Sequence, residues 1–140
     1  MFNIIFDLDD TLYPEIEYVK SGFKVVSEKI NNDWPNFSKD YIFQRLVYLE
    51  ALDRKKVFDR YLIEINSHSV KYLNRIIQCY RNHTPNIKLK PNIVNILEKL
   101  RENHRLGLIT DGNKKVQTNK VNALNLKRYF DFSKAWAILN

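Results

Sequence analysis

Two short polar stretches of this 140-residue sequence contain the side chains best suited to chemistry. In the first, Asp7 and Asp9 directly follow an apolar run at residues 2–6 and lie two positions apart, so both can face one ligand. A carboxylate can attack a phosphoryl group, and a second carboxyl can protonate the leaving group and then activate water. Clustered acids also attract Mg²⁺, which prefers oxygen ligands. A plain polar turn is the other interpretation, but a charge directly after a buried strand needs a partner or a metal.

The second polar stretch comes after another apolar run, at residues 106–109. Thr110 offers a hydroxyl, and the backbone N–H groups of Asp111 and Gly112 precede a helical pattern. Backbone N–H groups ahead of a helix are suited to binding phosphate oxygens. Lys114 and Lys115 come next and form either a solvated helix start or a positive field that attracts an anionic substrate.

The elements that must position these stretches have the order of an α/β protein. The apolar run at residues 2–6 predicts a strand that is apolar on both faces and buried inside a parallel sheet, and the run at residues 106–109 predicts a second strand. Apolar residues at helical spacing predict helices from Pro91 and over residues 115–125. Residues 15–82 predict three or four helices without a strand, with Ser38 and Asp33 as candidate helix starts. A strand–helix–strand order predicts a parallel sheet, whose ligands bind beyond the carboxyl ends of the strands. We therefore expect a Rossmann-like α/β core at residues 1–14 and 86–140, interrupted by a helical insertion at residues 15–85.

The two polar stretches resemble known signatures. Residues 6–12 (FDLDDTL) resemble the first signature of the haloacid dehalogenase (HAD) hydrolases, Asp-x-Asp-x-Thr after an apolar strand. Residues 108–113 (LITDGN) resemble the second signature, an apolar strand that ends in Thr or Ser. Gln117, Lys120 and residues 124–131 (LNLKRYFD) resemble the segment after the second signature in many members. The spacing resembles that of members with a helical cap between the two signatures.

The resemblance implies a role for each matching residue. Asp7 is the implied nucleophile and a Mg²⁺ ligand. Asp9 is the implied general acid and base, with its backbone carbonyl on the metal. Thr110 is implied to hold the phosphoryl group, helped by the backbone of Asp111 and Gly112. Because dehalogenases proper lack the second aspartate, the resemblance favours hydrolysis of a small phosphate monoester over cleavage of a carbon–halogen bond.

The resemblance implies two later signatures, one with a lysine and one acidic, and neither has a match after Asp131. Lys134 comes too soon after Asp131 to be the family lysine, and Lys120 lies between signatures, so neither is assigned as catalytic. We therefore expect a truncated or degenerate member in which the strand at residues 2–6 has one open edge. The tail after Asp131 either departs from the family sequence or shields that edge. An open edge can also pair with a second copy of the chain.

Composition limits the remaining alternatives. The net charge of +7 favours anionic partners, but no recognition motif supports a basic nucleic-acid-binding domain. A single cysteine, Cys79, excludes an internal disulfide. No stretch has the length of an export signal or a membrane span, so we expect a cytoplasmic protein without a membrane partner. A catalytically inactive fragment or interaction module remains the main alternative to a hydrolase.

Overall fold

The computed structural model describes residues 1–131 and 136–139 of the chain. The chain divides into two compact units. The α/β unit consists of residues 1–18 and 84–140, and the helical unit consists of residues 19–83. The first boundary falls four residues later than the sequence division at residue 14, within helix α1 (Glu15–Asp33), because this helix runs from one unit into the other without a break.

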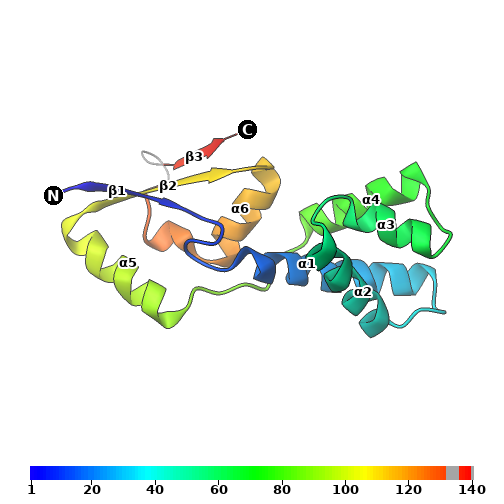
Figure 1. Cartoon of the computed structure of the whole chain (residues 1–140). Coiled ribbons are helices and arrows are strands. Elements are labelled where there is room, and N and C mark those ends of the chain that lie inside the picture. The colour runs from blue at the N-terminus through cyan, green and yellow to red at the C-terminus, as the bar shows by residue number, and fades with distance from the viewer. Residues whose placement is uncertain (132–135, 140) are drawn as a thin grey trace. The chain divides into compact units, whose positions relative to one another are not determined.

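The α/β unit contains a parallel sheet of three strands in the order β1-β2-β3 (Figure 1). The strands are β1 (Asn3–Asp7), β2 (Arg105–Asp111) and β3 (Trp136–Leu139). Helices α5 (Pro91–Asn103) and α6 (Lys114–Ala123) lie on the same side of the sheet, and the short 3-10 helix η1 (Leu126–Arg128) comes after α6. This arrangement confirms the predicted α/β class with a parallel, Rossmann-like sheet.

Strand β1 lies at the edge of the sheet and pairs only with β2 among the described residues. Its aromatic and β-branched residues favour a strand, but alternate side chains are exposed. Ile5 retains 62% of its surface, whereas Phe6 packs edge-on against Phe130 on the covered face. The expectation of a strand buried on both faces is therefore wrong for this chain, while the expected open edge is present. A sheet covered by helices on one side leaves every second side chain of β1 exposed.

Strand β3, which the sequence did not predict, shows on which side of the sheet the described part of the tail after Asp131 lies. The strand pairs with β2, from Leu108 opposite Trp136 to Asp111 opposite Leu139. It therefore lies on the far side of β2 from β1, so the described part of the tail does not shield the open edge. Residues 132–135 and 140, also part of that expectation, lie outside the described residues.

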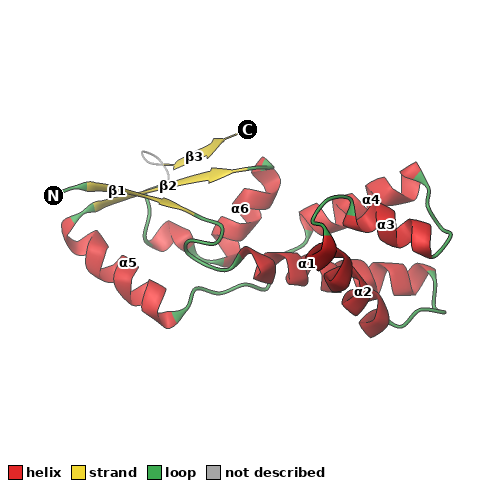
Figure 2. Cartoon of the chain, in the orientation of Figure 1, coloured by secondary structure: helices red, strands yellow, loops and turns green. Residues whose placement is uncertain are grey.

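The helical unit is built from most of α1 together with α2 (Lys39–Leu52), α3 (Val57–Glu64) and α4 (Val70–Asn82) (Figure 2). The Ser38 side chain accepts a hydrogen bond from the Tyr41 N–H and caps α2, as predicted. Asp33 is instead the last residue of α1, where its carboxylate pairs with Lys29 and accepts a hydrogen bond from Tyr72. The apolar core of the unit joins all four helices and consists of buried residues: Val19, Phe23, Val26, Ile30, Ile42, Leu46, Leu49, Val57, Tyr61, Leu62 and Ile76.

None of the helices in the described part of the chain combines the length and the apolarity needed to cross a membrane.

Candidate active site

The two polar stretches meet at one end of the sheet. Strands β1 and β2 run parallel, and their register places Asp7 opposite Ile109, one residue before Thr110. The arrowheads of both strands point the same way in Figure 1. Thr110 and Asp111 belong to β2 itself, not to the loop after it as the sequence suggested. Because neighbouring strands are about 4.8 Å apart, the ends of both signature stretches share one edge of the sheet.

Buried leucines shape the loop after β1. Leu8 and Leu12 are almost fully buried, and the Leu8 carbonyl accepts hydrogen bonds from the N–H groups of Thr11 and Leu12. Asp10 adopts a left-handed backbone conformation with φ of 55°, and its carboxylate accepts a hydrogen bond from the Glu15 N–H at the start of α1. The loop is therefore a tight turn held at both ends, which fixes the position of Asp9 within it.

Donors from three directions surround the Asp9 carboxylate. The Tyr13 hydroxyl donates to Oδ1 at 2.6 Å, and Lys120 Nζ lies 2.8 Å from each of the two oxygens. Gln117 Nε2 reaches Oδ2 at 3.5 Å. Burial, the hydrogen bond to Asp9 and the charge of Asp9 all raise the pKa of the Tyr13 phenol. Tyr13 therefore remains a hydrogen-bond donor at any working pH.

Gln117 connects the first stretch to the second. Its Nε2 also donates to the carbonyl of Asp111 at 2.8 Å, and its Oε1 accepts a hydrogen bond from the Thr110 hydroxyl at 3.2 Å. Thr110 and Gln117 are both buried. A continuous path of side chains therefore runs from Asp9 through Gln117 to Thr110, although Asp9 and Thr110 lie more than a hundred positions apart in the sequence.

The remaining residues of the predicted site occupy different environments. Asp7 is exposed at the end of β1, which leaves its carboxylate accessible to a ligand. Gly112 has φ of 113°, a conformation that glycine adopts without strain, and its N–H already donates to the Leu139 carbonyl at 3.1 Å. Asn113 caps α6 by accepting a hydrogen bond from the Val116 N–H. The phosphate contact assigned to the Gly112 N–H therefore stays a prediction that competes with a sheet hydrogen bond.

Sequence reasoning did not assign a role to Gln117 or Lys120. Both lie on the buried face of α6 together with Val121 and Leu124. The four positions have the helical spacing i, i+3, i+4 and i+7, so two polar residues occupy an otherwise apolar stripe. Polar residues in register with a buried stripe are the signal that could have identified them.

The oxygen donors of the first loop fit a magnesium ion. The Asp7 carboxylate and the Asp9 backbone carbonyl are hard ligands of the kind that Mg²⁺ prefers. Among the described residues, no group of three or more His, Cys, Asp or Glu side chains is gathered as a metal site. Mg²⁺ commonly keeps several waters and takes only one or two carboxylates together with substrate phosphate, so the small donor set is compatible with it.

The fold and the site together define an α/β protein with two strand-end signatures of the hydrolase type at one edge of a parallel sheet. Residues 4–135 match the haloacid dehalogenase-like hydrolase family. This chain belongs to that family. No curated protein sequence matches the chain.

Solved structures of the same class share the fold. A haloacid dehalogenase-like family hydrolase from Xanthomonas campestris is 15% identical with a TM-score of 0.54, over 99% of this chain and 61% of that chain. The protein YfnB from Bacillus subtilis, determined bound to magnesium, is 15% identical with a TM-score of 0.52, over 97% of this chain and 62% of that chain. A candidate beta-phosphoglucomutase from Thermotoga maritima is 18% identical with a TM-score of 0.52, over 99% of this chain and 61% of that chain. The chain therefore spans about three fifths of the length of these structures.

Proposed function

We propose that this chain is a phosphatase-type HAD-like hydrolase that cleaves a phosphate monoester of a small metabolite with the help of Mg²⁺. The observation that carries the proposal is the path from Asp9 through Gln117 to Thr110, because it connects the acid and base candidate to the phosphate-binding candidate. The magnesium in the YfnB structure and the phosphoryl chemistry implied by the name of the Thermotoga maritima protein support the same reaction class.

In the proposed reaction, Asp9 enters protonated, the Asp7 carboxylate attacks phosphorus, the ester bond breaks, and the leaving oxygen takes the proton of the Asp9 carboxyl. Asp9 is then the carboxylate that pairs with Lys120. Water then attacks the acyl phosphate while the Asp9 carboxylate accepts its proton. The bond between Asp7 and phosphorus breaks, and inorganic phosphate leaves. The Thr110 hydroxyl donates to Gln117 in this structure and would turn to donate to a phosphoryl oxygen during both steps.

The Asp7 carboxylate and the Asp9 carbonyl would hold the metal, which offsets the repulsion between Asp7 and a dianionic substrate when it is bound. We propose a cytoplasmic location, where phosphorylated metabolites would be available to the enzyme.

Hydrolysis of p-nitrophenyl phosphate with and without Mg²⁺ tests the proposal. Asp7→Asn should lower the rate by roughly 10³-fold or more, because it removes the nucleophile. Asp40→Asn, at an exposed position on α2, makes the same chemical change away from the site and should leave the rate unchanged. Equal rates for the unsubstituted chain and Asp7→Asn would contradict the proposal. Halide release from a 2-halocarboxylate without phosphate release would reassign the reaction to carbon–halogen cleavage.

A non-catalytic interaction module is the second candidate, and the open edge of β1 is the observation that favours it. Phe2 and Ile5 are exposed there, and unpaired strand edges readily bind another strand. An inactive chain that binds a partner through β1 would support this candidate over the hydrolase.

A further inference from the structure

A partly buried ion pair, in which the lysine is buried and the aspartate is partly exposed, links α6 to the loop after β1. Lys120 Nζ contacts both carboxylate oxygens of Asp9 at 2.8 Å, and Glu15 Oε1 lies 3.9 Å away. Lys120 retains only 2% of its surface, and its ammonium lies 4.6 Å from the centre of the Tyr18 ring. The lysine is therefore enclosed by two acids and an aromatic face.

Stability alone does not explain a lysine at this position. An ammonium taken out of water costs several kcal/mol unless it is paired, and apolar residues that replace a buried ion pair are often neutral or stabilising. Val121 and Leu124 occupy the same buried stripe of α6, so an apolar side chain would suit the position. The charge at this position is therefore better explained by its effect on the orientation of the Asp9 carboxylate.

The ion pair fixes the Asp9 carboxylate in one orientation. Lys120 Nζ donates to both carboxylate oxygens, the Tyr13 hydroxyl donates to Oδ1, and Gln117 Nε2 lies beside Oδ2. Rotation of the carboxylate would break all of these contacts together. A group held in this way has little freedom to lose when a reaction begins.

We propose that Lys120 is a positioning residue that holds the Asp9 carboxylate in place to accept the proton of the attacking water. The inference rests on the proposed function and adds a residue to it. Lys120 acts through Asp9, because its contacts are with Asp9, Glu15 and Tyr18. In the assisted step, Asp9 takes the proton, the bond between Asp7 and phosphorus breaks, and phosphate leaves.

Three variants test the role of Lys120. Lys120→Met removes the charge at similar length, Lys120→Arg keeps the charge, and Lys127→Met removes an exposed lysine from η1 as the matched control. With p-nitrophenyl phosphate and Mg²⁺, Lys120→Met should lower kcat by roughly 10- to 100-fold with KM nearly constant, because Asp9 is no longer held. Lys120→Arg should recover part of kcat, and Lys127→Met should match the unsubstituted chain.

The phosphorylated enzyme provides a second measurement that a purely structural lysine would not change. p-Nitrophenolate leaves without much help from an acid, so loss of Lys120 should slow the water step more than the first step. Acid-quenched Lys120→Met should therefore carry more phosphate on Asp7 at steady state than the unsubstituted chain. In Lys120→Met combined with Asp9→Asn, kcat should equal that of Asp9→Asn alone, since the two residues act as a unit.

The possible results distinguish the positioning role of Lys120 from the proposed hydrolase function. Turnover by Lys120→Met equal to that of Lys127→Met overturns the positioning role and leaves the proposed function intact. An unsubstituted chain with neither turnover nor phosphorylated Asp7 refutes the proposed function and the positioning role with it. If Lys120→Met does not fold, Lys120→Arg decides: a lower kcat at constant KM supports the role, and an unchanged kcat refutes it.

Discussion

The Thr110 hydroxyl donates a hydrogen bond to Oε1 of Gln117 at 3.2 Å, inside the buried region between β2 and α6. The same amide donates through Nε2 to the Asp111 carbonyl. One side chain thus satisfies a buried hydroxyl and a backbone carbonyl at the end of the strand. The geometry of the second signature depends on a residue of the helix that comes after it.

Replacement of Gln117 by leucine should therefore destabilise the α/β unit. Gln117→Leu leaves the Thr110 hydroxyl and the Asp111 carbonyl without this partner, which should lower the free energy of unfolding by about 1–3 kcal/mol. Urea unfolding monitored by circular dichroism measures the change. Asn122→Leu, at an exposed position of α6, is the matched control and should change stability by less than about 0.5 kcal/mol. Equal stabilities for the two variants would show that the Gln117 contacts contribute nothing.

Local patterns in the sequence were sufficient to predict much of the fold and the placement of the two polar stretches at one edge of the sheet. Apolar runs predicted β1 and β2, helical spacing predicted α5 and α6, and the strand–helix–strand order predicted a parallel sheet. These features are visible from sequence because each depends on neighbouring residues or on simple connection rules. The same connection rules place Asp7 and Thr110 at one edge of the sheet, where both strands end.

The partners of the site residues could not be predicted in the same way. Lys120 pairs with Asp9 across 111 positions, and nothing in the sequence near either residue specifies the other. The exposure of Ile5 was also unpredictable from its local pattern, because an apolar run looks the same whether helices cover one face of the sheet or both. Asp33 has a side chain that favours helix starts, but Lys29 and Tyr72 hold it at the end of α1.

In the helical unit, Gly22 should not tolerate a side chain. A Cβ at Gly22 would overlap the ring of Tyr80 on α4, and contacts with Phe23 and Phe58 keep that ring in place. Alanine gains about 1 kcal/mol in helix propensity over glycine. Overpacking in a core costs about 1–3 kcal/mol, and the overlap with an aromatic ring puts Gly22→Ala toward the upper end. We therefore expect net destabilisation in urea unfolding.

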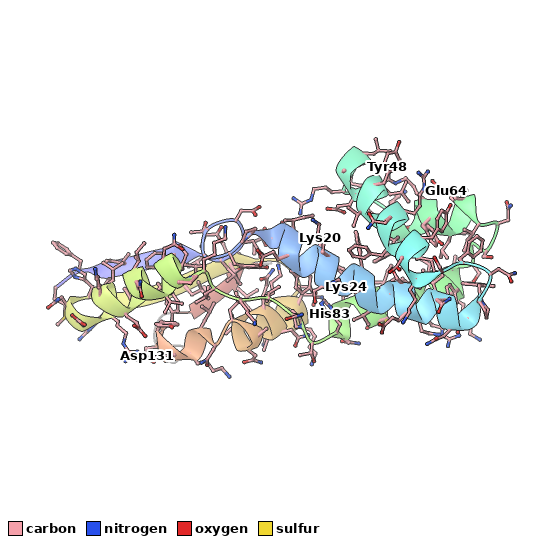
Figure 3. All side chains as sticks on the ribbon, turned by 90° about the horizontal axis from the view of Figure 1, so that it is seen from below. Lys20, Lys24, Tyr48, Glu64, His83 and Asp131 are labelled. Atoms are coloured by element: carbon pink, nitrogen blue, oxygen red, sulfur yellow. The ribbon has the colours of Figure 1, made fainter. Side chains whose placement is uncertain are left out.

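The matched control for Gly22→Ala is Lys24→Ala. Lys24 lies on the same helix at an exposed position, where it is labelled in Figure 3. Its replacement should change stability by less than about 0.5 kcal/mol. A Gly22→Ala variant at least as stable as the unsubstituted chain would show that α1 and α4 can separate slightly at no cost.

His83 should make the helical unit less stable in mild acid. Burial lowers the pKa of His83, whose Nδ1 is hydrogen-bonded to the Tyr80 carbonyl. The unfolded chain then binds a proton more readily than the folded chain once the pH falls below about 6.5. Stability is therefore complete above that pH and declines below it.

Urea midpoints at pH 7.5 and pH 5.5 measure this effect. The unsubstituted chain should show a lower midpoint at pH 5.5, and His83→Gln should show a smaller difference between the two conditions. His68→Gln replaces an exposed histidine of the same unit and should retain the full difference. The lowered pKa values of Asp33 and Glu64 act in a more acidic range, so they do not produce a decline at pH 5.5. An identical pH response in His83→Gln and the unsubstituted chain would exclude His83 as its source.

The open edge of β1 leads us to expect self-association at high protein concentration. The strand has one neighbour in the described chain, and Ile5 retains 62% of its surface beside that edge. Two copies can satisfy their edges by pairing with each other.

Each copy carries a net charge of +7, so their repulsion should weaken the dimer at low salt and added salt should strengthen it. Sedimentation equilibrium at 50 mM and 500 mM NaCl should therefore show more dimer at the higher salt. Ile5→Lys should shift the chain toward monomer, and Ile96→Lys, at an exposed position on α5, should not. A chain that stays monomeric in both salt conditions would contradict the prediction.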